Sequence, residues 1–241
     1  MTGPIALVGS GEFTATMLAT DAALLDLAEA AGFDRVVAVI PTAAAPDGHA
    51  VVRRWLDKAH AHYAALDAEV VEVDVRDHHD ATELQHCASV ETAGFVYLSG
   101  GKPDHLTASL RDTPLLDIVL ERWRDGMALA GCSAGAMTLA AGWPPFGRSG
   151  GVWGSGLGVL PRLGLLPHFD RFGRMRLGGA GGIGKHTPTG WTAIGVDEDT
   201  ALVHPGSQGV DGWRVEGVGD VWHLGADGVV PLDPSLLTHL L

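Results

Sequence analysis

The feature that most constrains the fold is an alternation, over the first 140 residues, between short apolar runs and longer segments with helical patterns. The apolar runs are rich in β-branched residues and hydrophobic at nearly every position, which is typical of parallel strands buried on both faces. We expect strands at Ile5–Val8, Val36–Ile40, Val70–Val75, Phe95–Leu98 and Met127–Ala130. We expect helices at Thr14–Ala31, Gly48–Leu66, Ala81–Ala88 and from Pro103 to Trp123. This alternation predicts an α/β fold, a three-layer α/β/α sandwich around a mostly parallel central sheet.

The chain changes character after Ala141. Residues 142–190 are rich in glycine and proline, and so long a stretch is expected to form a lid or short irregular elements. From Trp191 onward, alternating apolar residues predict hairpin strands at Thr192–Val196, Thr200–Val203, Val210–Val215 and Val221–Leu224, before a terminal helix from Pro234. Because we find no internal repeat and no linker, we expect residues 1–241 to form a single domain.

Composition narrows the classes of function. Hydrophobic residues make up 46% of the chain and charged residues 19%, as in a globular protein. The formal charge of −13 disfavours a nucleic-acid partner and an anionic membrane. We find no signal peptide and no apolar run long enough to span a bilayer. The two cysteines, Cys87 and Cys132, form neither a disulfide framework nor a zinc motif, so we expect a cytoplasmic protein without metal or other cofactor.

The strongest chemical motif follows the fifth predicted strand. The run from Met127 enters Gly131-Cys132-Ser133-Ala134-Gly135, a G-x-S-x-G pattern, and then small residues that suit the start of a helix. A sharp strand-to-helix turn of this kind displays a hydroxyl at the ligand-binding end of a parallel sheet. The N–H groups that follow lie at a helix N-terminus, where an oxyanion is stabilised. Ser133 is therefore a candidate nucleophile, a plain tight turn is the alternative, and Cys132 is interpreted as a small buried hydrophobe.

A serine nucleophile needs a base, and three of the 12 histidines are candidates. His168 comes first, because it follows an apolar run and precedes a cluster of charged residues. Its alternative interpretation is a helix start with arginines on a solvated face. His186 is second and His204 third.

Together these segments resemble peptidase family S51, which contains cyanophycinases and aspartyl dipeptidases. The resemblance runs from Gly9 to about Val203, and its most specific parts are Gly131–Met137, His168-Phe169 and Asp197–Leu202. It implies a flavodoxin-like fold similar to that of class I glutamine amidotransferases. It also implies a serine hydrolase that cleaves a peptide or isopeptide bond next to an aspartyl residue, through an acyl-enzyme and without a cofactor.

The resemblance assigns roles to particular residues. Ser133 matches the nucleophile and His168 the base, whereas residues 126–169 contain no acid to orient the imidazole. Glu198 is the first choice for that acid, with Asp197 and Asp170 as alternatives. Leu98-Ser99-Gly100-Gly101 matches the family's Gly-Gly turn. The turn implies an oxyanion hole at Gly101 and Ala134.

The implied substrate is a small peptide or an amino acid derivative. An acidic substrate needs local cations, and we expect substrate contacts from Gly100, Lys102, Arg148, Arg171 and Arg174, with Arg162 and Arg176 as solvated surface residues. Lys102 stands where the family usually has an amide side chain. Trp153, in the glycine-rich stretch Gly147–Gly158, is a candidate lid residue. An amidase or esterase using the same serine, and a catalytically silent binding protein, stay open as alternatives; a homodimer is compatible with the sequence, which identifies no interface.

Overall fold

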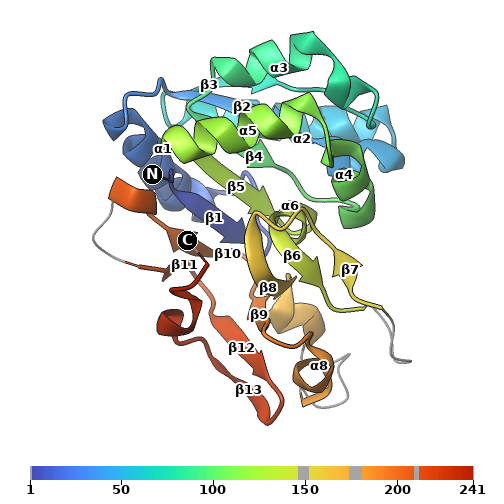
Figure 1. Cartoon of the computed structure of the whole chain (residues 1–241). Coiled ribbons are helices and arrows are strands. Elements are labelled where there is room, and N and C mark those ends of the chain that lie inside the picture. Colours follow the sequence, from blue (N-terminus) through green and yellow to red (C-terminus); the bar gives the residue numbers. More distant parts are fainter. Residues whose placement is uncertain (1, 146–151, 174–180, 209–211, 241) are drawn as a thin grey trace.

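The computed structural model describes residues 2–145, 152–173, 181–208 and 212–240 (Figure 1). Its larger sheet has seven strands in the order β11-β10-β1-β5-β4-β2-β3. The bounds are β1 Ile5–Val8, β2 Val36–Ile40, β3 Glu69–Glu72, β4 Phe95–Leu98, β5 Ala128–Cys132, β10 Thr200–His204 and β11 Arg214–Gly217. The first five of these strands in chain order run parallel, and β10 and β11 extend the sheet beyond β1 by two antiparallel pairings. The predicted mostly parallel sheet is confirmed.

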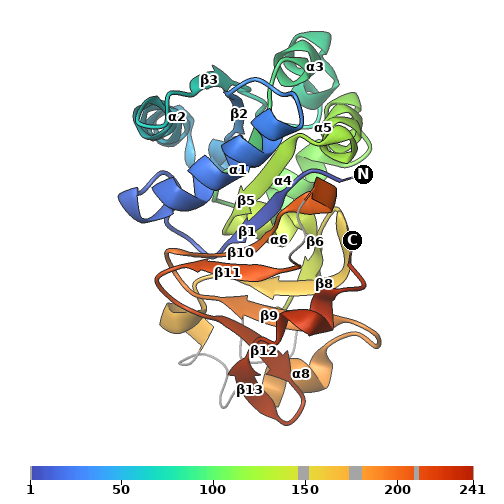
Figure 2. The ribbon, with the colours of Figure 1, turned by 90° about the vertical axis from the view of Figure 1, so that its left-hand side faces the viewer.

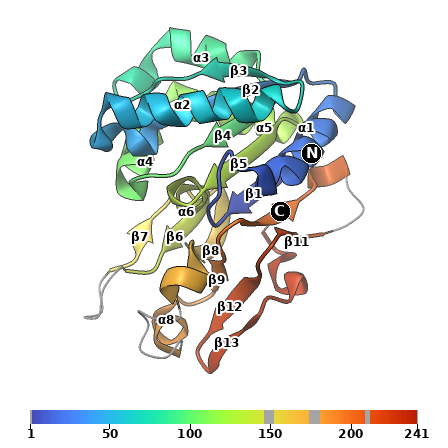
Figure 3. The same ribbon diagram turned by 180° about the vertical axis from the view of Figure 1, so that it is seen from behind.

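Helices cover both faces of this sheet, as the apolar runs require. Successive residues of β1 enter opposite cores: Ile5 and Leu7 join one hydrophobic cluster, and Ala6 and Val8 the other. Figure 2 shows α1 (Leu18–Ala30) and α2 (His49–Ala64) on one side of the sheet. On the other side lie α3 (Leu84–Glu91), α4 (Pro103–Leu110) and α5 (Pro114–Asp125). The three-layer sandwich is therefore confirmed, and the view from behind shows α2 and α1 across the near face (Figure 3).

A second, six-stranded sheet adjoins the first. The strands expected at Thr192–Val196 and Val221–Leu224 belong to it, whereas its other strands were not predicted. Its order is β13-β12-β9-β8-β6-β7. The bounds are β6 Ala140–Trp143, β7 Gly154–Ser155, β8 Leu160–Leu166, β9 Thr192–Val196, β12 Val221–Gly225 and β13 Gly228–Pro231. The expectation of a lid or short irregular elements in residues 142–190 did not include strand β8, which runs parallel between β6 and β9. Leu163, Leu165 and Ile194 continue the core of the first sheet across this junction.

The remaining elements are short. They are the 3-10 helices Ala15–Met17, Thr42–Asp47, Asp80–Thr82, Gly206–Gln208 and Pro234–Leu237, the π-helix Phe169–Gly173, and the helices α6 Ala134–Leu139 and α8 Gly181–His186. The terminal helix predicted from Pro234 is a single 3-10 turn. Across the described ranges, no helix has the length and hydrophobicity needed to cross a bilayer.

Candidate active site

The turn between β5 and α6 has a geometry that only its own sequence pattern allows. Ser133 sits there with φ 49° and ψ −106°, a sparsely populated region for a residue with a side chain. A Cβ added to Gly131 would lie 2.4 Å from the carbonyl carbon of Gly135, and one added to Gly135 would lie 2.2 Å from the Leu98 carbonyl oxygen. Both positions therefore require glycine. The G-x-S-x-G pattern follows from these two close approaches.

The imidazole of His168 lies next to the displayed hydroxyl. The distance from Ser133 Oγ to His168 Nε2 is 3.0 Å. On its other side, His168 Nδ1 lies 2.7 Å from Glu198 Oε1. When the Glu198 oxygen accepts a hydrogen bond from Nδ1–H, Nε2 is the ring nitrogen left to accept from the serine hydroxyl. The side chains of His168 and Glu198 are each 27% exposed, so this pair is only partly screened by water.

Phe169 fixes the place of its neighbour His168. Its side chain is fully buried and lies against Gly195 of β9, where an added Cβ would meet the phenyl ring at 2.5 Å. The ring centroid also lies 6.2 Å from that of Trp222. His168 itself has φ 51°, so the chain turns sharply after β8 and directs the imidazole toward Ser133. The His-Phe pair thus has a structural reason: one side chain anchors the turn and the other is presented by it.

The two alternative acids support the turn that carries Glu198. Asp170 Oδ1 accepts a hydrogen bond from the Glu198 backbone N–H at 3.0 Å. Asp197 accepts from Trp222 Nε1 at 3.0 Å and from the Asp220 N–H at 3.0 Å. The structure therefore brings Glu198 to the imidazole and places Asp170 and Asp197 in backbone and tryptophan contacts beside it.

His186 and Trp153, the candidate lid residue, lie against the second sheet. The His186 carbonyl accepts a hydrogen bond from Trp153 Nε1 at 2.9 Å. Trp153 also packs edge-on against Trp191 and covers Gly164 of β8. Much of the predicted lid, residues 147–151, lies outside the described residues. The described part gives Trp153 contacts on the second sheet.

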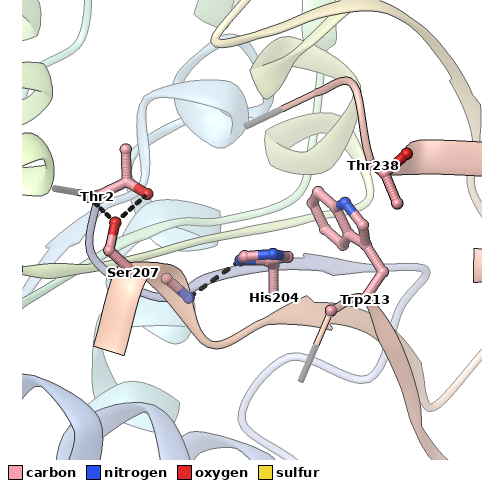
Figure 4. Close-up of a pocket in the computed structure, with 7 residues that line it drawn as sticks. Thr2, His204, Ser207, Trp213 and Thr238 are labelled. Carbon is pink, nitrogen blue, oxygen red and sulfur yellow. Dashed lines mark hydrogen bonds between the residues drawn. The ribbon is translucent and has the colours of Figure 1, made fainter. Parts of the chain in front are cut away.

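His204 belongs to a different cavity at the far end of the strands. It pairs with Ile5 at the start of β1, whereas Val8 at the end of β1 pairs with Cys132 beside Ser133. The cavity has a volume of about 250 Å³ and is lined by Thr2, His204, Gly206, Ser207, Gly212, Trp213 and Thr238 (Figure 4). Burial, with a smaller effect of nearby Arg214, lowers the pKa of His204. Of the three candidate bases, the structure brings His168 to Ser133.

The glycine turn after β4 lies directly beside the serine. A Cβ added to Gly100 would lie 3.5 Å from Ser133 Cβ, and the Gly100 N–H donates to Glu12 Oε1 at 3.1 Å. Gly101 has φ 146°, and a Cβ there would lie 2.2 Å from the Ala43 carbonyl oxygen. That same carbonyl accepts from the Lys102 N–H at 2.7 Å. The turn is therefore held rigidly against both Glu12 and Ala43.

Two of the predicted substrate cations border the site. Lys102 Nζ lies 3.8 Å from Asp47 and its side chain is 59% exposed. Arg171 Nη1 lies 3.6 Å from Glu198 Oε1, and its side chain is 68% exposed. Arg148 and Arg174 lie outside the described residues, as does Arg176. Arg162 is exposed on β8, as expected for a surface residue.

Glu12 is the residue that the sequence did not single out. It is only 7% exposed, and its Oε2 accepts a hydrogen bond from Cys132 Sγ at 3.0 Å. Burial, and secondarily the Glu12 charge, raise the pKa of Cys132 well above its ordinary value, so the thiol keeps its proton. The interpretation of Cys132 as a small buried hydrophobe is thus incomplete, because the thiol is also a hydrogen-bond donor. The one available signal was the place of Glu12, directly after Gly9-Ser10-Gly11 at a strand end.

Within the described ranges, no group of three or more His, Cys, Asp or Glu side chains could hold a metal ion.

Comparison with known proteins places this geometry in a family. The family model described as peptidase family S51 matches residues 5–208. A cyanophycinase of Trichormus variabilis is 34% identical over 187 residues, which are 73% of this chain and 58% of the relative. A cyanophycinase of Geminocystis herdmanii is 30% identical over 183 residues, 72% of this chain and 64% of the relative. The chain thus spans about six-tenths of the length of these curated relatives.

Solved structures agree with the sequence matches. The crystal structure of a peptidase from an acI-B1 Actinobacterium superposes with a TM-score of 0.85 at 31% identity, covering 96% of this chain and 94% of the other. A putative peptidase E protein from Listeria monocytogenes EGD-e has a TM-score of 0.60 at 18% identity over 91% of this chain and 100% of the other, and shares the fold. The predicted resemblance is confirmed: the chain belongs to peptidase family S51.

Proposed function

We propose that this chain is a serine peptidase in which Ser133, His168 and Glu198 act as nucleophile, base and orienting acid. The observation that carries the proposal is the unbroken series of contacts from Ser133 Oγ to His168 and from His168 to Glu198, at 3.0 Å and 2.7 Å. Both distances lie within ordinary hydrogen-bond range, and the strained turn at Ser133 has no evident purpose other than displaying the hydroxyl. Membership of family S51 supports the same reaction.

The proposed reaction has two halves. In the first, His168 Nε2 takes the hydroxyl proton as Ser133 Oγ bonds to the substrate carbonyl carbon. The C–N bond of the resulting tetrahedral intermediate then breaks, and the imidazolium passes its proton to the departing amine. In the second half, water attacks the acyl-enzyme with His168 again as base, which releases the carboxylic acid and restores the serine. Glu198 stabilises the imidazolium in both halves.

The oxyanion formed in each half needs preorganised donors. We propose the N–H groups of Gly101 and Ala134 for this role. The amides on either side of Gly101 already donate hydrogen bonds, that of Gly100 to Glu12 and that of Lys102 to the Ala43 carbonyl. Ala134 is the first residue of α6, and the first N–H groups of a helix have no partner within it. Loss of one such donor typically costs about 3 kcal/mol of transition-state stabilisation.

We further propose that the scissile bond is a peptide or isopeptide bond next to an aspartyl residue. A substrate carboxylate needs a cation near the nucleophile, although the chain carries a formal charge of −13. Lys102 follows the glycine turn beside Ser133, and Arg171 lies beside Glu198. The side chains of both residues are largely exposed, so the Lys102 ammonium and the Arg171 guanidinium can each reach a ligand. Cyanophycinases among the relatives are consistent with a substrate of this general kind.

The test is a substrate panel with matched variants. The purified chain is incubated with α-aspartyl dipeptides, β-aspartyl dipeptides, the matching asparaginyl dipeptides and simple esters, and released amine or alcohol is measured. We expect turnover of at least one aspartyl series, no turnover of its neutral asparaginyl match, and loss of all turnover in Ser133→Ala. Turnover confined to esters contradicts the aspartyl assignment but keeps the serine hydrolase. Turnover that persists in Ser133→Ala contradicts both.

A further inference from the structure

One buried carboxylate joins the loops that the proposed mechanism relies on. Glu12 follows β1, Gly100 follows β4, and Cys132 ends β5. Through its two oxygens, Glu12 accepts from the Gly100 N–H at 3.1 Å and from the Cys132 thiol at 3.0 Å. The side chain therefore ties together the ends of three neighbouring strands directly beneath Ser133.

The segment that carries Glu12 also contacts the acid turn. A Cβ added to Gly9 would lie 2.1 Å from the Asp197 carbonyl oxygen, and one added to Gly11 would lie 2.0 Å from Asp199 Oδ1. Thr14 Oγ1 donates to the Gly11 carbonyl at 2.8 Å and approaches Asp199 Oδ1 at 3.4 Å. The segment Gly9–Thr14 thus touches the glycine turn on one side and the turn of Glu198 on the other.

Burying the carboxyl group of Glu12 costs free energy unless hydrogen bonds compensate for the lost contact with water. A carboxylate that is 7% exposed is stable only when hydrogen bonds replace its lost hydration. Here the bonds come from one backbone amide and one thiol, and charge-assisted bonds of this type hold their donors more strongly than neutral ones. The Gly100 N–H is consequently occupied by Glu12, and the oxyanion hole proposed above uses the next amide of the turn, that of Gly101.

We propose that Glu12 is a positioning residue for the oxyanion hole: by binding the Gly100 amide and the Cys132 thiol, it sets the glycine turn and the nucleophile turn at the separation that the tetrahedral intermediate requires. This inference rests on the proposed function. It assigns Glu12 no contact with substrate and no proton transfer.

The experiment measures the second-order rate of Ser133 labelling by a fluorophosphonate. Ser133 Oγ bonds to its tetrahedral phosphorus, fluoride leaves, and the phosphoryl oxygen of the adduct is placed in the proposed oxyanion hole. Glu12→Gln keeps an oxygen to accept from Gly100, Glu12→Leu keeps the volume without an acceptor, and Glu12→Ala keeps neither. We expect Gln to retain most of the rate, and Leu and Ala to lose about 10²-fold, the effect of displacing a catalytic group by about 1 Å. The profile of rate against pH should keep its midpoint and lose height, because Glu12 does not act as the base.

Two controls separate positioning from loss of fold. Asp21→Asn alters another buried carboxylate, 1% exposed and bonded to His62 and Tyr63, and should label at the wild-type rate. Cys132→Ala removes the thiol and keeps the Gly100 bond, so it should lose less than Glu12→Leu. Rates are scaled to the folded fraction from thermal melts.

The outcomes are distinguishable from those that bear on the hydrolase itself. If wild type labels and Glu12→Leu labels as fast as Glu12→Gln, the hydrogen bond to Gly100 is irrelevant and the inference fails while the proposed function stands. If the midpoint of the pH profile moves in Glu12→Gln, Glu12 acts on the base and not on the oxyanion hole. If folded wild type does not label, the proposed function fails and this inference with it.

Discussion

The substitution Glu198→Gln tests the contact that orients the proposed base. When His168 takes the serine proton it becomes an imidazolium beside Glu198, with Nδ1 and Oε1 2.7 Å apart. Two unit charges about 4 Å apart interact by about 4 kcal/mol at an effective dielectric constant of about 20. Partial exposure, 27% for each side chain, reduces that figure. We therefore expect kcat to fall by about 10² to 10³, since each 1.4 kcal/mol or so corresponds to a factor of ten.

The assay is steady-state turnover of the best substrate of the panel, with circular dichroism to confirm the fold. KM should change little, because Glu198 acts on the transition state and not on substrate binding. Asp170→Asn and Asp197→Asn are matched controls that also neutralise one carboxylate but keep an oxygen for their backbone donors. Each should lose at most about tenfold, the worth of one ordinary hydrogen bond. A Glu198→Gln enzyme with wild-type kcat, or a larger loss in Asp197→Asn, would refute the assignment of the acid.

Three further predictions follow from other contacts. Gly135→Ala should lower stability by about 1–3 kcal/mol and abolish turnover, because its Cβ would lie 2.2 Å from the Leu98 carbonyl oxygen; Gly212→Ala, with nothing within 4 Å, is the thermal-melt control. Lys102→Met should raise KM for an aspartyl dipeptide about tenfold and leave kcat nearly unchanged, which steady-state kinetics measures; an unchanged KM would remove Lys102 from substrate binding. The Arg53 hydrogen bonds lower the pKa of Glu72 from 4.5 to about 2. Between these pH values the unfolded chain therefore binds more protons than the folded one. The stabilisation present above pH 4.5 is lost as the pH falls toward 2. Denaturant titrations measure the free energy of unfolding at about pH 6 and about pH 3. The difference between the two pH values should be about 1 kcal/mol smaller in Glu72→Gln than in wild type, since this surface pair is partly screened. An equal difference in both proteins would contradict the pairing.

The first sheet was predictable because its signals are local. The runs Ile5–Val8, Val36–Ile40 and Phe95–Leu98 are apolar throughout, and their predicted bounds match β1, β2 and β4. Helical segments between them define the crossovers. In the second sheet, β9 and β12 were predicted from similar local patterns, whereas β8 was not. Strand β8 contains Pro161 and Gly164 and pairs with β6 and β9 in parallel, so its pattern is interrupted and its partners are set by tertiary packing.

The candidate site, too, could be predicted from the sequence only in part. The turn at Ser133 could be predicted from the sequence, since the glycines around it are required by close backbone approaches. The choice of Glu198 over its neighbours came from resemblance, and the structure places Glu198 against His168. The only signal for Glu12 was its place after a glycine-rich strand end, and that signal is weak because a single acid there usually lies in solvent. Its buried contacts with Gly100 and Cys132 depend on three strand ends that meet only in the folded chain.

The most direct test of the central claim is the site of covalent labelling. The folded chain is treated with a fluorophosphonate, and its intact mass and proteolytic peptides are measured by mass spectrometry. We predict one adduct per chain, located on Ser133, and none in Ser133→Ala or in His168→Ala, which lacks the imidazole 3.0 Å from the hydroxyl. An unmodified wild-type chain, or an adduct that forms as fast without the imidazole, would contradict the claim that His168 activates Ser133.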